Sequence, residues 1–118
     1  MSKEYNPKEF EKKWQDKWFK DLAYEGKDFD EKPKYYLLVE FPYPSGPGTH
    51  IGHARNYSMM DAVARIRRMM GYNVIYPIGW DAFGLPTENY AIKVKRPPQD
   101  ITTENINNFR SQLKSLGL

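Results

Sequence analysis

The segment YYLLVEFPYPSGPGTHIGH, residues 35–53, is the most informative part of this sequence for its fold. Residues 35–41 are mostly apolar and aromatic, a composition that suits a β-strand. The segment that follows is rich in proline and glycine and predicts a loop. A helical pattern begins at about residue 52 and ends near residue 70, where Gly71 is placed to terminate it. Strand, loop and helix in this order are typical of the start of a nucleotide-binding parallel sheet.

Residues 73–77, NVIYP, predict a second strand after this helix. A strand–helix–strand crossover of this length is right-handed and makes the two strands parallel. Because residues 35–41 are almost continuously apolar, we expect the first strand to be buried on both faces. Two further helices are predicted, over residues 86–94 and from Thr102 to about residue 116, the second with Ile106, Phe109 and Leu113 on one face. The predicted fold class is α/β, the first half of a Rossmann-like parallel sheet with flanking helices.

The residues before this unit predict a helix of their own. Asn6 and Pro7 form a helix start, and Glu9 is placed to close a capping box. Apolar side chains then recur at every fourth position: Phe10, Trp14, Trp18 and Leu22. We expect this stripe to pack on the core or on an adjoining domain; stacking of Trp14 or Trp18 on tRNA is the alternative. A charged linker, residues 26–33, follows, so we divide the chain into a helix with its linker (residues 1–34) and a nucleotide-binding unit (residues 35–118).

The central helix has two predicted faces. The positions expected to pack are Ala54, Ala62, Ile66, Met69 and Met70. The basic positions are Arg55, Arg65, Arg67 and Arg68. We expect the basic positions to form a solvated surface, in which the arginines near the end of the helix also complement its dipole.

Composition limits the possible functions. The chain of 118 residues is one domain at most, and its net charge of +3 permits a nucleic-acid partner without requiring one. It has no cysteine, which excludes disulfides and cysteine-ligated zinc within these residues. No apolar run approaches the ~20 residues that span a membrane, and the N-terminus lacks a signal-peptide pattern. We therefore expect a cytoplasmic protein with no membrane contact.

The only two histidines of the chain lie at the predicted junction of loop and helix. His50 and His53 are three residues apart, so they project from the same side of the first helical turn. Gly52 between them leaves the backbone open to a flat ring such as adenine. The N–H groups of a helix N-terminus attract phosphate oxygens, and two imidazoles can stabilise charge on a phosphate during displacement. A site for a nucleoside triphosphate is one interpretation; a plain turn and a histidine metal pair are the others, although further metal ligands are lacking and no metal site is predicted.

Two segments around this junction carry a family resemblance. Residues 41–57 read FPYPSGPGTHIGHARNY, and residues 71–89 read GYNVIYPIGWDAFGLPTEN. Together they resemble the class I aminoacyl-tRNA synthetases, whose signature is the HIGH tetrapeptide, and among these the leucyl enzymes. The isoleucyl enzymes are similar here but typically have histidine where this chain has Phe83, and Thr49 departs from the usual leucine. The resemblance extends over nearly the whole chain.

The resemblance implies an ATP-dependent ligase. His50, Gly52 and His53 would bind ATP, and the two histidines would be catalytic, stabilising the transition state of adenylate formation. Leucine, ATP with Mg²⁺, and tRNA(Leu) would be the partners, with leucine first converted to leucyl-adenylate and then transferred to the tRNA. The second class I signature, KMSKS, does not occur in these residues, nor do the tRNA-binding and editing domains of the family. We therefore expect an N-terminal fragment of the catalytic domain that has little or no aminoacylation activity alone.

The resemblance also implies a leucine pocket. Phe41 and Tyr43 would line it, and Asp81 would hold the leucine α-ammonium group through a charge-assisted hydrogen bond. From the residues alone, Asp81 is better explained as a turn or N-cap residue and Tyr43 as an ordinary loop aromatic.

Two other functions stay open. The HIGH tetrapeptide is shared with some other nucleotidyltransferases, although the segment after the second strand argues against them. A non-catalytic module could instead bind tRNA or another protein through Arg65, Arg67 and Arg68 and through the helix that carries Trp14 and Trp18.

Overall fold

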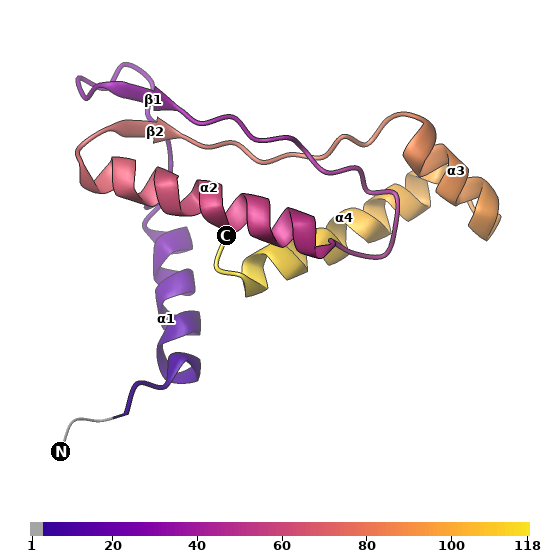
Figure 1. Cartoon of the computed structure of the whole chain (residues 1–118), viewed down its shortest axis with the longest axis horizontal. Coiled ribbons are helices and arrows are strands. Elements are labelled where there is room, and N and C mark those ends of the chain that lie inside the picture. The colour runs from indigo at the N-terminus through magenta and orange to yellow at the C-terminus, as the bar shows by residue number, and fades with distance from the viewer. Residues whose placement is uncertain (1–3) are drawn as a thin grey trace.

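The computed structural model describes residues 4–118, and in these it has four helices and two short strands (Figure 1). The elements are α1 (Pro7–Lys20), β1 (Lys34–Tyr36), α2 (Ile51–Met69), β2 (Asn73–Ile75), α3 (Leu85–Val94) and α4 (Pro98–Ser115). The strands and the extended segments that follow them run along one side of α2, and α4 lies near the N-terminal half of α2. Within the described residues no helix is both long and apolar enough to cross a membrane.

The two strands are parallel, as predicted. Their register pairs Tyr35 with Val74, and the ladder is continued by a hydrogen bond from the Leu37 N–H to the Ile75 carbonyl, 2.9 Å long. The first strand is shorter than the predicted range 35–41, because beyond residue 37 the chain continues extended without pairing. The expectation of burial on both faces is wrong: Tyr36 and Leu38 are 63% and 68% exposed. Two strands covered on one side leave their other side open among the described residues.

The central helix α2 begins and ends close to the predicted positions. His50 is its N-cap residue, and Gly71 follows its last turn at φ +90°, a conformation that suits glycine. The predicted packing positions are mostly wrong, since Ile66 and Met69 are exposed. The buried residues of α2 are Tyr57 and Ala64. The reason is that α2 packs against β2 and the extended segments along a narrow stripe, and the rest of its surface lacks a neighbour.

Helix α1 starts where the sequence predicts but packs much less. Asn6 is the N-cap residue, yet its side chain donates to the Glu9 carboxylate (3.1 Å), so the predicted capping box does not form. No residue of α1 is buried, and Leu22 lies beyond its end at φ +49°. The helix projects away from the rest of the fold in Figure 1, which explains why only its last turns find partners. Trp18 is the member of the stripe that does so.

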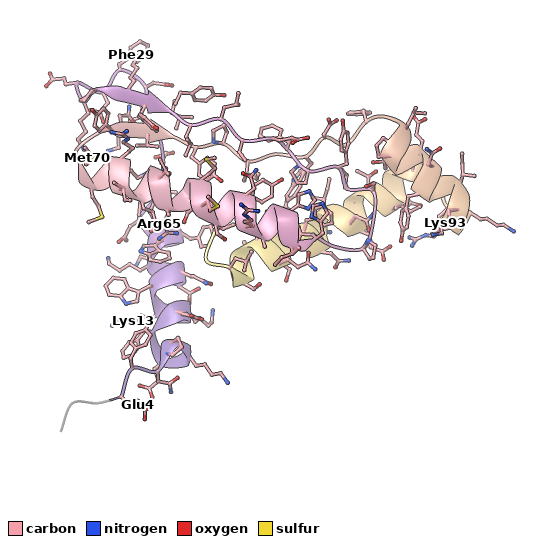
Figure 2. All side chains as sticks on the ribbon, viewed as in Figure 1. Glu4, Lys13, Phe29, Arg65, Met70 and Lys93 are labelled. Carbon is pink, nitrogen blue, oxygen red and sulfur yellow. The ribbon has the colours of Figure 1, made fainter. Side chains whose placement is uncertain are left out.

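The expectation of a solvated arginine face on α2 holds for Arg55, which is exposed, and is wrong for the other three arginines. The Arg65 guanidinium stacks at 4.6 Å on the rings of both Trp18 and Tyr24, and it also bonds to the Asp61 carboxylate. Figure 2 labels Arg65 where α1 meets α2. Arg67 and Arg68 stack on tyrosine rings in the same way. Arg65 and Arg68 therefore join the N-terminal helix and the turn after it to α2, because planar guanidinium groups pack well on aromatic faces.

Helix α4 supplies most of the remaining core. It begins at Pro98, four residues before the predicted start, with proline in the first helical turn. Its buried residues follow a helical spacing: Ile101, Asn105, Phe109 and Leu113. Leu113 meets Tyr57 and Val39 in the central cluster, between α2 and the segment after β1. The core thus lies beside the N-terminal half of α2, next to the predicted site.

Candidate active site

The two loops at the carboxyl ends of the strands come together at one edge of the fold. The Asp81 N–H donates to the Pro42 carbonyl (3.0 Å), which joins the loop after β1 to the loop after β2. The Phe41 ring lies against Gly79, where a Cβ atom would be 2.8 Å from the ring. This close approach requires glycine at residue 79. The carboxyl edge of a parallel sheet is where open α/β folds bind their ligands.

Tyr43 and Asp81 meet across these loops. A hydrogen bond to the Asp81 carboxylate is the main cause that raises the pKa of the Tyr43 hydroxyl, and the negative charge of Asp81 adds to it. Both side chains are exposed, and among residues 4–118 Asp81 has no ion-pair partner. The pair therefore presents an accessible carboxylate beside two aromatic rings, Tyr43 and Phe41, an arrangement suited to an ammonium group attached to an apolar side chain.

His50 and His53 form a reciprocal capping box at the start of α2. The His53 N–H donates to His50 Nδ1 (3.3 Å), and the His50 N–H donates to His53 Nδ1 (3.4 Å). The two rings stack with centroids 3.8 Å apart. Because each Nδ1 accepts a hydrogen bond, the proton of each neutral ring is assigned to Nε2. The residues thus present two Nε2–H donors beside the open N–H groups of a helix N-terminus.

Gly52 allows this stacking. A Cβ atom at residue 52 would lie 2.9 Å from the His50 ring, so any other residue would push the ring away. From the sequence, Gly52 was expected to leave the backbone open to adenine. In the structure its close neighbour is the imidazole of His50, the N-cap residue of α2, so glycine is also required here for the two histidine rings to stack.

His53 is the more protected of the two histidines. Its ring stacks parallel to Tyr57 at 5.7 Å and lies 6.3 Å from the buried ring of Phe109. Desolvation by burial is the largest cause that lowers the pKa of His53 below 6.5, and repulsion from His50 lowers it further. At neutral pH, His53 is therefore uncharged and acts as a hydrogen-bond donor rather than as a fixed cation.

Helix α4 contacts the loop in front of the histidines, and sequence reasoning missed this. The buried Asn105 donates to the Pro44 carbonyl (2.8 Å). The side-chain oxygen of Gln112 accepts from the Thr49 N–H (2.7 Å) and from the Thr49 hydroxyl (3.0 Å). The signal in the sequence was weak, because Asn105 and Gln112 lie four residues before and three after Phe109, at the edge of the predicted packing face of Ile106, Phe109 and Leu113 rather than on it.

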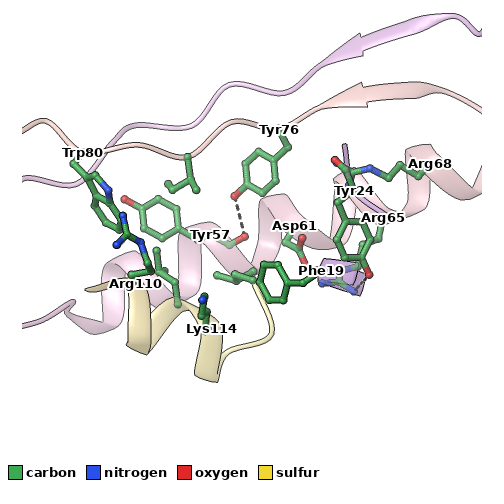
Figure 3. A pocket seen from close by; sticks show the side chains of 13 residues that line it. Phe19, Tyr24, Tyr57, Asp61, Arg65, Arg68, Tyr76, Trp80, Arg110 and Lys114 are labelled. Atoms are coloured by element: carbon green, nitrogen blue, oxygen red, sulfur yellow. Dashed lines mark hydrogen bonds and ion pairs between the residues drawn. The ribbon is translucent and has the colours of Figure 1, made fainter. Parts of the chain in front are cut away.

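A separate cavity of about 510 Å³ lies between α2, α4 and the segment after β2 (Figure 3). Its wall includes Tyr57, Tyr76 and Trp80, and the Tyr76 hydroxyl donates to the Tyr57 carbonyl (3.1 Å). None of the predicted ATP- or leucine-binding residues lines it. The candidate site is thus an open edge formed by the two loops, and this cavity is not part of it.

Comparison with known proteins supplies the family. Residues 13–116 match the family described as tRNA synthetases class I (I, L, M and V). This chain belongs to that family. The class I synthetase chain is 54% identical over 116 residues to a leucine–tRNA ligase of Alkaliphilus oremlandii (strain OhILAs), a match that covers 98% of this chain and 14% of that protein.

A solved structure agrees with this assignment. The crystal structure of a ternary LeuRS–tRNA–LeuAMS complex of Agrobacterium radiobacter K84 matches the class I synthetase chain with a TM-score of 0.90 and 39% identity. The match covers 97% of this chain and 15% of that one. The predicted Rossmann-like α/β fold class is confirmed by this similarity. The chain spans only about 14% of the length of the leucine–tRNA ligase that it matches.

Proposed function

We propose that this chain carries the ATP- and leucine-binding part of a leucine–tRNA ligase. The observation that carries the proposal is the convergence of two loops at one sheet edge, where the Asp81 N–H donates to the Pro42 carbonyl and the Asp81 carboxylate raises the pKa of Tyr43. The stacked histidine pair follows the first of these loops, at the start of α2. The 54% identity to a leucine–tRNA ligase supports the choice of leucine. We propose residues 35–118 as the nucleotide-binding unit and residues 1–34 as a helix and linker attached to it.

The ATP site is proposed to consist of His50, Gly52 and His53. Both Nε2–H groups donate to phosphate oxygens, and the N–H groups at the start of α2 favour negative charge there. Because the rings stack at 3.8 Å, they act as a pair of hydrogen-bond donors that stabilise the charge growing on the α-phosphate during displacement. The histidines are catalytic in this sense, and proton transfer by them is not required.

The leucine site is proposed to consist of Phe41, Tyr43 and Asp81. The Asp81 carboxylate binds the α-ammonium group of leucine, and the two aromatic rings line the pocket for its side chain. The Tyr43 hydroxyl, whose pKa is raised by Asp81, is placed to help orient that carboxylate. Gly79 contributes by admitting the Phe41 ring.

In the proposed reaction, an oxygen of the leucine carboxylate bonds to the α-phosphorus of ATP, and the bond between that phosphorus and the bridging oxygen breaks. Leucyl-adenylate and pyrophosphate result. A hydroxyl of the terminal ribose of tRNA(Leu) then bonds to the leucyl carbonyl carbon, and the bond from that carbon to the adenylate oxygen breaks, which releases AMP. Within the described part of the chain, no three His, Cys, Asp or Glu side chains gather in a manner suited to a metal. The Mg²⁺ that accompanies ATP is therefore proposed to be held mainly by phosphate oxygens and water. The cytoplasm is the proposed location.

The competing proposal of a non-catalytic RNA- or protein-binding module loses support. It relied on Arg65, Arg67 and Arg68 as free basic groups and on the helix that carries Trp14 and Trp18. All three arginines are stacked on aromatic rings of this chain, and Trp18 is one of those rings, which leaves Trp14 exposed. The proposal of another HIGH-type nucleotidyltransferase lacks a role for the contact between Tyr43 and Asp81.

Ligand binding to the chain itself tests the proposal. The two histidine rings are observed by NMR while ATP with Mg²⁺ is added, and leucine or isoleucine is added afterwards. We expect ATP to shift both histidine signals, leucine to cause a further shift that isoleucine does not, and Asp81→Ala to abolish the leucine effect only. Binding is measured because the chain alone is expected to have little aminoacylation activity.

A glycine pair provides the matched control. Gly52→Ala places a methyl group 2.9 Å from the His50 ring and is expected to abolish the ATP shift. Gly46→Ala meets no atom within 4 Å in the adjoining loop and is expected to leave it intact. The proposal fails if ATP leaves both histidines unchanged in the wild-type chain, or if both alanine variants respond alike.

A further inference from the structure

The loop between β1 and α2 has almost no hydrogen bonds of its own. Among the described residues, the backbone of residues 43–49 makes two hydrogen bonds, from the Thr49 N–H and to the Pro44 carbonyl. Both partners are side chains of α4, Gln112 and Asn105. Proline lacks an N–H group and glycine adds flexibility, so a loop of this composition cannot hold one conformation by itself. Its conformation is therefore decided by α4.

Three α4 residues form one contact surface toward this loop. Asn105, Phe109 and Gln112 lie on one helical face, since they are spaced by four and three residues. Asn105 is 4% exposed and Phe109 is 1% exposed, and the Phe109 ring lies beside His53. Gln112 stands at the end of this surface, next to the residue that precedes the HIGH tetrapeptide. We call Asn105, Phe109 and Gln112 the α4 support.

Gln112 makes the contact nearest to the histidines. Its oxygen accepts from both donors of Thr49, whereas the leucine that the family usually has there would offer only the N–H group. Its amide nitrogen fits closely against Gly48, where a Cβ atom would lie 2.6 Å away. Thr49 is bonded directly to His50, whose Nδ1 accepts from the His53 N–H. A change in the Thr49 backbone would therefore turn the His50 ring and break the reciprocal capping box.

We propose that Gln112, on the α4 support, is a positioning residue that holds the Thr49 backbone so that His50 and His53 present their Nε2–H groups to ATP. It acts through Thr49 and does not touch the nucleotide. The inference rests on the proposed ATP site and adds the element that orients it. Sequence motifs alone do not indicate this role, because Gln112 lies almost sixty residues after the HIGH tetrapeptide.

The test uses the 118-residue chain and the variant Gln112→Met, which keeps the side-chain length and removes the acceptor. Gln112 is exposed, so the variant is expected to fold. Asn108→Ala, also exposed on α4, is the matched control. The first measurement is the pKa of His53 by NMR without ligand. Desolvation by burial, the larger cause of the lowered pKa, should remain in Gln112→Met, but repulsion from the stacked partner His50 should weaken as that ring moves away. We therefore expect the pKa of His53 to rise part of the way toward 6.5 in Gln112→Met and to stay unchanged in the control.

The second measurement is ATP affinity, which we expect to fall about fivefold in Gln112→Met, the effect of one hydrogen bond of ordinary strength. Gln112→Glu keeps the acceptor and is expected to keep the Thr49 amide slow in hydrogen exchange, whereas Gln112→Met makes it fast. An unchanged His53 pKa and an unchanged Thr49 exchange rate in Gln112→Met would overturn the positioning role.

The two proposals fail separately. If ATP does not bind the wild-type chain, the proposed function fails, while the ligand-free pKa of His53 still decides the role of Gln112. If ATP binds equally well to Gln112→Met and its His53 is unchanged, the ATP site stands and the positioning role is wrong. A general loss of fold in Gln112→Met, seen by circular dichroism, would equally overturn the inference, since the residue would then be a structural one.

Discussion

Replacing Arg65 with methionine is expected to lower the free energy of unfolding by about 3 kcal/mol. The guanidinium donates to the Tyr24 hydroxyl (2.6 Å) and to the Gly117 carbonyl (2.8 Å), and it pairs with Asp61. It also stacks on Trp18 and Tyr24 at 4.6 Å. One side chain thus connects α1, the turn after it and the end of the chain to α2.

The magnitude follows from these contacts and from the exposure of the side chain, 27%. Each of the two hydrogen bonds to neutral groups is taken as about 1 kcal/mol, the ordinary value and less than the ~1.5–3 kcal/mol of a bond with a fully buried charge, because water can still reach the guanidinium. Each ring contact adds ~0.5 kcal/mol, and an i,i+4 ion pair adds about 0.4 kcal/mol. Methionine keeps the apolar volume, so no large cavity term is added.

Urea unfolding followed by far-ultraviolet circular dichroism measures the change without depending on the nearby tryptophan. Two further arginines of α2 provide a graded control. Arg67 only stacks on Tyr35 and Tyr72, at 4.8 and 5.6 Å, so Arg67→Met should cost about 1 kcal/mol. Arg55 is exposed, and Arg55→Met should stay within about 0.5 kcal/mol of the wild type.

The order of the three variants in free energy of unfolding tests whether the arginines of α2 stabilise the fold by stacking. If Arg65→Met costs no more than Arg55→Met, the arginines of α2 are solvated after all, and the reasoning from stacking is refuted. The basic surface would then again be available to RNA, and the module proposal would regain its main support.

Three further predictions concern the site and its support. The free energy of unfolding is expected to fall as the pH drops from about 7.5 to about 5.5. Because the pKa of His53 is lowered in the folded chain, the unfolded chain binds a proton at a higher pH, near 6.5, than the folded chain does. Urea unfolding of His53→Gln should therefore show a weaker dependence on pH. Phe109→Ala is expected to cost about 3–5 kcal/mol, because its ring is 1% exposed, and an equal stability of Phe109→Ala and Asn108→Ala by the same method would contradict the α4 packing. Asp81→Asn is expected to lower the pKa of Tyr43 toward 10.0, since the carboxylate is what raises it; an NMR titration of labelled tyrosine in which that pKa does not move would rule out the contact.

Much of the fold could be predicted from local patterns. The strand–loop–helix order, the parallel pairing of residues 34–36 with residues 73–75, and the end of α2 before Gly71 all follow from composition and spacing. Burial could not be predicted in the same way. An apolar run predicts that a segment is able to be buried, yet Tyr36, Leu38 and Met69 are exposed because the described residues offer them no covering surface.

Local motifs were enough to identify the family resemblance and to nominate the residues of the candidate site, because the histidines, the glycine between them and the loops around them are contiguous in the sequence. Three other features could be seen only in the packed fold: the approach of Asp81 to Tyr43, the stacking of arginines of α2 on aromatic rings, and the contact of α4 with the loop before His50. They could not be predicted because their partners are far apart along the chain. Gln112 and Thr49 are 63 residues apart, and such a contact depends on how the helices pack, which no local pattern encodes.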